Sequence, residues 1–275
     1  ISGLGNEAVN VSSGSASTSQ ANALAADTSG VVTATISDGD MATLAGLTET
    51  GNAYSITITD NSVAAAALNT LDGKTSVAIN ASNITTLTGA AADLNTAYTA
   101  NGNGSITGLG NEAATLNDTT LAVSILNDLD GNTSGAIDAS SINTLTSDDY
   151  DSLNTAYTAA GSGAITGLGN EAITVNNRIR ASEANTLNGH TSGVVTATVT
   201  NSDGTGNLSV SNALTLGGTG NAYSILIQDQ TVSVSDLLTI DGITTTTVNA
   251  KNIRTLTGSY SNVISAYSSE TAGTI

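Results

Sequence analysis

The chain has 275 residues, 23 acidic and 5 basic, and its formal net charge of −18 argues against nucleic acid as a partner because phosphate backbones would be repelled. It has no cysteine for disulfides or thiolate metal sites, and no run of about 18 apolar residues that could span a membrane as a helix. Aromatic residues, at 3%, are too few for an ordinary compact core, whereas charged residues, at 10%, are too few for disorder driven by charge. This composition favours a repeat protein.

Ten repeats built around four phrases run through the whole chain. We name them A for GLGNEA, B for GVVTAT, C for GNAYSI and D for the stretch from TLTG to AY, and their order is A-B-C-D-A-D-A-B-C-D. The repeats lie near residues 1–30, 31–51, 52–76, 77–105, 106–135, 136–164, 165–193, 194–220, 221–245 and 246–275. Ile275 falls where another A repeat would begin, and no initiator Met opens the chain. We therefore expect a single continuous array that is a segment of a longer chain.

In chain order, the first signal in most repeats is a short run of alternating apolar and hydroxyl side chains, at 31–36, 54–59, 173–175 and 223–227. Alternation with period two predicts strands. An Asp or Asn corner follows each run, and then a stretch of small residues that ends in LNTLDG or TLTG. The segments 90–98 and 147–157 predict one or two helical turns, which are stable only when they pack on neighbours.

One such repeat cannot bury an apolar face alone, but stacked repeats can, with strands pairing in parallel at about 4.8 Å. We therefore expect an all-β fold with short helical turns, a parallel β-solenoid of about ten stacked rungs. Equivalent residues of successive repeats would then lie directly over one another. The alternative is an array of antiparallel sandwiches of about 105 residues each. The A-D pair at 106–164 weighs against it, because losing two of four repeats would break a closed sandwich.

Stacking also brings carboxylates of successive repeats close together, where they repel. A divalent cation would relieve that repulsion, and calcium prefers such hard oxygen ligands. The candidate metal ligands are the corner acids Asp38, Asp40, Asp60, Asp118 and Asp138 and the turn acids Asp72 and Asp130. The plainer interpretation is a solvated acidic surface that keeps the protein soluble.

The GLGNEA phrase formally fits the dinucleotide-binding pattern G-x-G-x-x-A, at Gly3, Gly108 and Gly167. That pattern requires a long helix directly after it, but strand-like residues follow here. We therefore interpret GLGNEA as a repeated turn whose glutamate, at Glu7, Glu112 and Glu171, binds backbone amides or solvent.

No residue set predicts catalysis, and we expect no enzyme. His190, the single histidine, occupies a turn position that other repeats fill with varied residues, which indicates a surface corner. Asp148, Asp149 and Asp151 form a polar loop in which solvated acids are the default interpretation. Tyrosines recur at equivalent positions: Tyr54 and Tyr223, then Tyr98, Tyr157 and Tyr267. We interpret them first as packing residues and second as a row that stacks on glycans.

The tandem phrases GLGNEA, NTLDG, TLTG and LNTAY resemble the very long, repeat-rich secreted surface proteins and adhesins of marine bacteria, cyanobacteria among them. The resemblance covers the whole chain. It implies an extracellular or cell-surface protein that is exported without disulfides, and it transfers no catalytic residue.

The function we expect is structural, a rigid rod or filament that serves as a surface fibre, adhesin stalk or matrix component. Its partners would be further copies of its own repeats or end-to-end copies of itself. The alternative is an adhesin module that binds surface glycans or ice through a regular threonine-rich face. A polysaccharide lyase is a third interpretation, which the lack of an acid pair in an aromatic-lined groove disfavours.

Overall fold

The computed structural model describes residues 3–201 and 206–275, and within them the chain forms two compact units. The first contains the residues up to 118 together with 128–141 and 162–166. The second contains 119–127, 142–161 and 167–275. Ile1 and Ser2, which open the first A repeat, lie outside the described residues.

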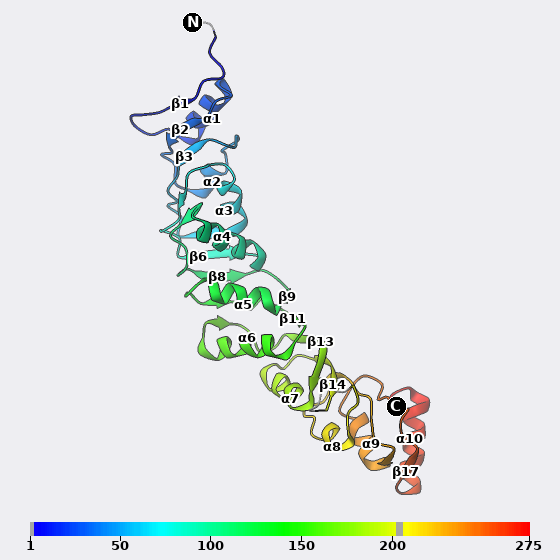
Figure 1. Cartoon of the computed structure of the whole chain (residues 1–275). Helices are drawn as coiled ribbons and strands as arrows, with labels where there is room; N and C mark the ends of the chain where they lie inside the picture. The colour runs from blue at the N-terminus through cyan, green and yellow to red at the C-terminus, as the bar shows by residue number, and fades with distance from the viewer. Residues whose placement is uncertain (1–2, 202–205) are drawn as a thin grey trace. The chain divides into compact units, whose positions relative to one another are not determined.

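Ten helices occur in these ranges, and each of the ten repeats contributes one of them (Figure 1). They are α1 (Thr18–Asp27), α2 (Met41–Leu44), α3 (Ala65–Asp72), α4 (Ala91–Asn103), α5 (Val123–Asn132), α6 (Tyr150–Ser162), α7 (Ala181–His190), α8 (Val210–Ala213), α9 (Val234–Asp241) and α10 (Tyr260–Ala272). Three of them, α4, α6 and α10, have 13 residues each and occupy the equivalent position in the three D repeats.

The strands of the first unit form three parallel sheets. The largest has the order β12-β10-β8-β6-β4, and the others are β1-β2-β3 and β5-β7. Their bounds are β1 (Val9–Asn10), β2 (Val32–Thr35), β3 (Ala53–Ser55), β4 (Ser62–Ala64), β5 (Ile79–Asn80), β6 (Thr86–Gly89), β7 (Ile106–Thr107), β8 (Ala113–Leu116), β10 (Ile137–Asp138) and β12 (Ile165–Thr166).

The second unit contains a five-stranded sheet of order β15-β14-β13-β11-β9 and the pair β16-β17, both parallel. Their bounds are β9 (Thr120–Ala122), β11 (Thr144–Ser147), β13 (Ala172–Arg180), β14 (Val195–Thr200), β15 (Ala222–Ser224), β16 (Thr231–Ser233) and β17 (Thr255–Thr257).

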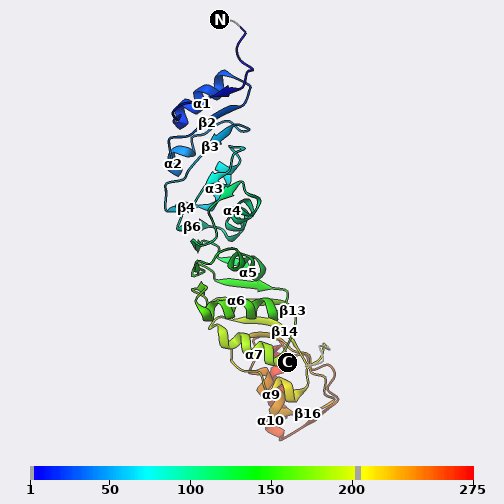
Figure 2. The same cartoon turned by 60° about the vertical axis from the view of Figure 1, so that its left-hand side comes forward.

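Successive repeats pair in register, as the stacking argument expects. Ile79 lies beside Ile106 in one ladder and Ile137 beside Ile165 in another, and all four are buried. Helices cover the same core, and α3 and α4 pack side by side in the first unit (Figure 2). The core of each unit is thus a set of apolar ladders, and the parallel pairing of equivalent residues is confirmed.

The predicted all-β solenoid of about ten stacked rungs is nevertheless wrong. The fold is mixed α/β, with helices alternating with parallel strands, and the coils do not close into a solenoid. The antiparallel sandwich alternative is also wrong for the described residues, because every paired strand among them is parallel.

The error came from the small-residue stretches, for which no more than one or two helical turns were expected. The stretch that ends in LNTLDG is the helix α3, and Ala65, Leu68 and Leu71 on it are buried at a spacing of three residues. This spacing places the three side chains on one face of a helix, against the core. The TLTG…AY stretches likewise hold full helices of more than three turns where one or two turns were expected.

Candidate functional site

The most regular polar structure in the molecule is the junction between an A repeat and its neighbours. In each A repeat the glutamate folds back on its own turn. Gly5 N and Asn6 N donate to Glu7 Oε2 at 2.7 and 3.1 Å, and the same two bonds recur at Glu112 and at Glu171. The interpretation of GLGNEA as a repeated turn whose glutamate binds backbone amides is therefore confirmed.

A threonine 20 or 21 residues further along, at the end of the same repeat, binds each of these turns. The hydroxyls of Thr28, Thr133 and Thr191 donate to the backbone carbonyls of the three motif glutamates, Glu7, Glu112 and Glu171. Thr75 and Thr244 make the same bond to the carbonyls of Tyr54 and Tyr223. We call this threonine contact the latch, and it joins the start of a repeat to its end at five places in the described residues.

A glycine lies two residues after the latch threonine wherever an A turn is the partner. A Cβ placed on Gly135 would lie 2.2 Å from the carbonyl oxygen of Glu112, and Gly30 and Gly193 meet Glu7 and Glu171 in the same way. Where the partner is a C repeat, Val77 and Thr246 stand at this position instead. The glycine of the TSG phrase is therefore required by the close approach of two backbones. The three TSG phrases are a sequence signal that could have predicted this contact.

A buried tyrosine completes two of the three A turns. Tyr157 Oη donates to the Glu171 carboxylate, and Tyr98 lies against Glu112. Both tyrosines are 5% exposed and both glutamates 1% exposed. Burial, together with the nearby carboxylate, raises the pKa of Tyr98 and of Tyr157 above the ordinary value.

His190 lies on top of one of these pairs. Its ring stacks on that of Tyr157 with centroids 4.7 Å apart and an interplanar angle of 4°. It is half-buried at the end of α7, and the surface-corner interpretation did not include its contact with Tyr157. The interpretation of the repeated tyrosines as packing residues holds for Tyr98 and Tyr157, and also for Tyr54 and Tyr223, which are buried too.

Three of the predicted metal ligands cap helices of the preceding repeat. Asp38 Oδ2 accepts from Thr18 N at 2.6 Å, Asp60 Oδ2 from Met41 N at 2.6 Å, and Asp118 Oδ2 from Ala91 N at 2.8 Å. The acceptors are thus bound to the first amides of α1, α2 and α4. Asp229, which the candidate ligand set left out, does the same for α8 through Val210 N at 2.8 Å. A carboxylate at a helix N-terminus satisfies a free amide and interacts favourably with the helix dipole.

The other four candidate ligands have local roles. Asp40 Oδ1 caps its own helix through Thr43 N, and Asp138 Oδ1 accepts from Ser140 N. Asp72 Oδ2 accepts from the Ser105 hydroxyl, and Asp130 is half-buried within α5. The backbone amide of Thr43 holds the pKa of Asp40 below its ordinary value, and the Ser140 side chain and amide do so for the pKa of Asp138.

In the described residues, the structure brings no three acidic or histidine side chains together in a way that could hold a metal ion. Calcium binding stays a prediction, which a thermal melt in calcium against a chelator would decide. An unchanged melting temperature would remove it.

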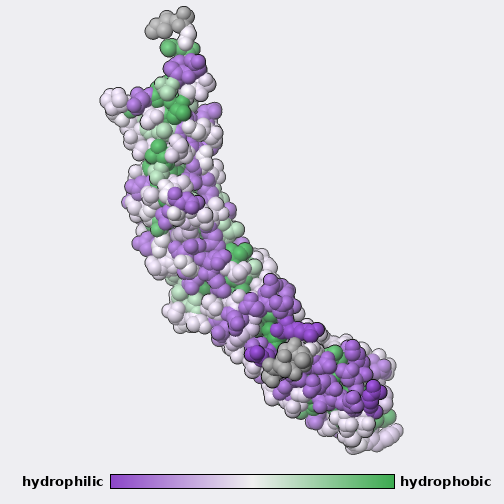
Figure 3. Space-filling view, in the orientation of Figure 1, coloured by the Kyte–Doolittle hydropathy of each residue, from purple (hydrophilic) through white to green (hydrophobic). Residues whose placement is uncertain are grey.

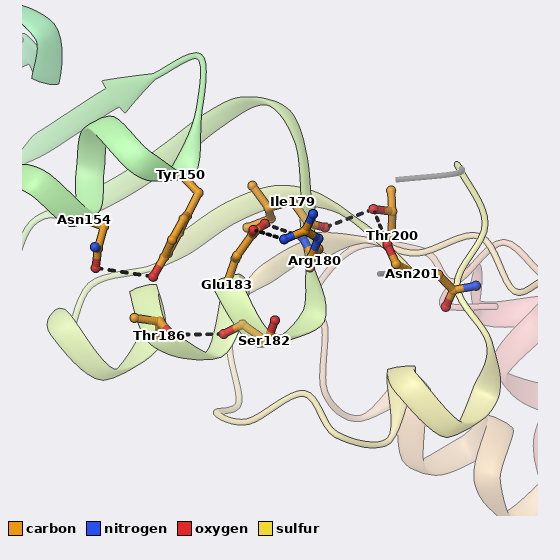
Figure 4. Close-up of polar contacts among 9 residues, drawn as sticks. All are labelled: Tyr150, Asn154, Ile179, Arg180, Ser182, Glu183, Thr186, Thr200 and Asn201. Atoms are coloured by element: carbon orange, nitrogen blue, oxygen red, sulfur yellow. Dashed lines mark hydrogen bonds and ion pairs between the residues drawn. The ribbon is translucent and has the colours of Figure 1, made fainter. Parts of the chain in front are cut away.

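The acidic loop before α6 lines a small polar pocket of the second unit with Ser124, Thr146 and Asn176. Within it, Asp148 Oδ1 accepts from Asn176 Nδ2 at 2.9 Å, and Asp149 Oδ1 caps α6 through Ser152 N at 2.7 Å. Nearby, Arg180 and Glu183 form an ion pair of 3.3 Å, and the Tyr150 side chain points from α6 toward α7 (Figure 4). These polar groups therefore stabilise helix starts and repeat contacts.

Threonines on several strands point outward. In β2, Val32 and Ala34 are buried while Thr33 and Thr35 are exposed. In the first unit, the exposed Thr57, Asn80 and Thr107 lie beside one another in register. Hydrophilic residues cover much of the visible surface, with hydrophobic ones in small groups (Figure 3).

Comparison with known proteins adds no relative. A scan against protein-family models gives no match, and searches of curated proteins and of solved structures likewise give none. No helix in the described part of the chain combines the length and the apolar character that a membrane span requires.

Proposed function

We propose that this chain is a structural protein of the cell exterior, a component of a surface fibre, an adhesin stalk or a matrix. The observation that supports this most directly is the use made of its polar side chains. The motif glutamates, the latch threonines and the corner aspartates all bind a turn or a helix start of their own or a neighbouring repeat. The polar groups that recur along the chain therefore hold repeats together.

The mechanism would be mechanical. Within each compact unit, neighbouring repeats share backbone hydrogen bonds between parallel strands and, in several places, an aspartate cap, while the threonine latch joins the start of a repeat to its end. A load on one repeat is thereby transmitted to the next through several bonds at once. Because repeat contacts are local, adding repeats extends the structure without a new fold.

An extracellular location fits the composition. The chain has no cysteine, so nothing in it depends on the redox state of its surroundings. Its strong negative charge favours solubility and disfavours non-specific association. The resemblance of its tandem phrases to secreted surface proteins supports the same location.

Immunogold electron microscopy of the producing cells tests this function. Antibodies raised against the chain should label extended structures outside the cell envelope. Label confined to the cytoplasm, or to compact particles free of fibres or matrix, would contradict the proposal.

Binding of glycans or ice through a threonine-rich face is the second candidate function. The observation in its favour is the outward row of Thr57, Asn80 and Thr107, with strands about 4.8 Å apart. A glycan array and an ice-recrystallisation assay test it. The variant Thr57→Lys should abolish any activity, whereas Thr99→Lys, at an exposed position of α4, should leave it unchanged.

A further inference from the structure

We propose that the helical segment of the first B repeat, residues 41–50, is a lid that opens by local unfolding while the strands beside it stay paired. We call this segment the B lid. The proposal rests on the structural function above and deepens it, because it names the element of the array that gives way first under load.

The B lid contains only one turn of helix. α2 has four residues, as does α8 in the other B repeat, whereas the helices of the other repeats have 8 to 13 in the described residues. Leu44 N donates to Asp40 O at 3.0 Å and Ala45 N to Met41 O at 2.9 Å, and the next two amides bond three residues back. One turn makes too few bonds to be stable alone, so the closed state depends on contacts with neighbouring repeats.

The apolar contacts of the B lid are few. Leu44 and Leu47 are its two buried side chains, whereas α3 buries three in eight residues and α4 buries four in 13. A groove separates the lid from α3, with these two leucines on one side and Leu71 and Lys74 on the other. Packing that a longer helix would provide is missing there, which lowers the cost of opening.

A buried polar group near the B lid also favours opening. Tyr54 is 1% exposed, and its hydroxyl has no hydrogen-bond partner among the described residues. The hydroxyl of the equivalent Tyr223 donates to Ala184 O at 3.5 Å. Burial, and then the charge of Glu49 in the lid, raise the pKa of Tyr54, so the phenol lies near this segment. Opening would let water reach the phenol and remove the cost of an unpaired polar group.

Polar side chains of the neighbouring repeats hold the B lid closed. Asn22 of α1 donates to Gly46 O at 2.7 Å and accepts from Thr48 N at 3.1 Å. Lys74 Nζ donates to Thr48 O at 2.9 Å, and Asp60 caps the first amide of α2. All four bonds are exposed or partly exposed, so each is replaced by a bond to water at small cost when the lid opens.

The strands on either side do not depend on the B lid. β2 and β3 pair through Thr33 with Ala53, Ala34 with Tyr54 and Thr35 with Ser55, all outside residues 41–50. The lid can therefore leave the core while this ladder stays intact. Under load it opens before the ladders break, and it closes again when the load falls.

Thiol labelling tests the proposal, because the chain has no cysteine and one introduced thiol reports its own exposure. Leu44→Cys probes the lid and Leu68→Cys probes α3, and both leucines are 0% exposed. With excess reagent, Leu44→Cys should react at least about tenfold faster. Low urea should not change its rate, because local opening exposes little surface, but should accelerate Leu68→Cys.

Amide exchange of the unsubstituted chain is the second readout, and it does not depend on how the cysteine variants fold. Amides of residues 43–48 should exchange faster than those of residues 68–72, at every urea concentration below the unfolding transition. Equal exchange in the two segments would overturn the proposal.

Two substitutions added to Leu44→Cys should act in opposite directions. Asp60→Ala removes the cap of α2 and should speed labelling about fivefold. Tyr54→Phe removes the unpaired hydroxyl and should slow labelling about tenfold. A Tyr54→Phe variant that reacts no more slowly would overturn the role given to the phenol.

The comparison of the two cysteine variants decides the proposal. Equal labelling rates with the same urea dependence would overturn it, since the lid would then open only together with α3. This result does not bear on the immunogold labelling, so the B lid and the structural function can fail separately.

Discussion

At the scale of single residues, the molecule depends on small side chains where two backbones meet. The glycine of each TSG phrase is required because the carbonyl of a motif glutamate occupies the space of its Cβ, as at Gly135. Another glycine of the same repeat, Gly131, lies in α5, and a Cβ at that position would lie in open space. Substitution of Gly135 therefore tests the close approach of two backbones, whereas substitution of Gly131 tests only the conformational freedom of glycine.

We expect Gly135→Ala to lower the free energy of unfolding by about 3 kcal/mol, since neither backbone can move away without breaking the latch. Gly131→Ala should leave stability unchanged or raise it by up to about 1 kcal/mol, because alanine favours helix. Urea midpoints of the two variants check this prediction. Equal midpoints would show that the Glu112 carbonyl does not restrict the site.

The buried tyrosines predict a loss of stability at alkaline pH. Burial raises the pKa of Tyr223 to about 12. The unfolded pKa is about 10, so the contribution of the neutral phenol is complete below about pH 10 and is lost as the pH rises through about 12. Tyr223→Phe should therefore lose less stability than wild type across this interval, as measured by urea midpoints at each pH.

Tyr267→Phe is the control for that measurement, because the Tyr267 side chain is exposed. It should follow the wild-type pH dependence. If Tyr223→Phe follows it as well, the phenol of Tyr223 does not contribute to the alkaline loss.

At the scale of elements, helices of one repeat are completed by residues of the next. The N-cap position of α4 is Ala90, which has no side-chain cap, and the Asp118 carboxylate supplies the missing acceptor from 27 residues further along. Packing of Leu94 and Ala97 on the core provides the rest of the stability of α4. The helix and the corner acid are therefore one structural element, although they belong to different repeats.

Removing the Asp118 cap should lower the stability of α4 by a measurable amount. We expect Asp118→Ala to lower the free energy of unfolding by about 1 kcal/mol, with faster amide exchange in the first turn of α4. Asp128→Ala removes the same charge from an exposed position of α5 and should cost less than about 0.5 kcal/mol. Equal losses in the two variants would mean that net charge, and not capping, sets the effect.

At the scale of the whole molecule, repeated junctions make the chain modular. The residues before Ile106 and before Ile165 belong to equivalent helices, and both isoleucines pair with an isoleucine of the preceding repeat. An A-D pair can therefore be removed without changing the residues that meet at the new junction.

We expect deletion of residues 106–164 to give a folded chain, because Ile165 would take the place of Ile106 beside Ile79. Circular dichroism should show the same helix content per residue, and unfolding should remain cooperative. Deletion of 106–150 joins unlike positions and should give an unfolded or aggregated product. A soluble, folded product from both deletions would contradict the junction rule.

The sequence alone determined the number and order of the repeats, the parallel pairing of equivalent residues and the turn conformation of GLGNEA. Each follows from local or periodic signals: repeated phrases, alternation with period two, and glycines that need positive φ, as Gly108 and Gly110 do at 91° and 126°. None of these three features requires knowledge of which residues contact one another across the core.

Only the tertiary structure decided the helix content and the partners of the polar residues. Short helices such as α3 are unstable alone, and packing on neighbouring repeats makes them helical, so local patterns in Ala-rich and Thr-rich stretches left strand and helix unresolved. The role of Asp118 was equally hidden, because the amide that it caps lies 27 residues earlier. The sequence identified the repeated carboxylates, and the fold alone placed helix ends and backbone turns against them.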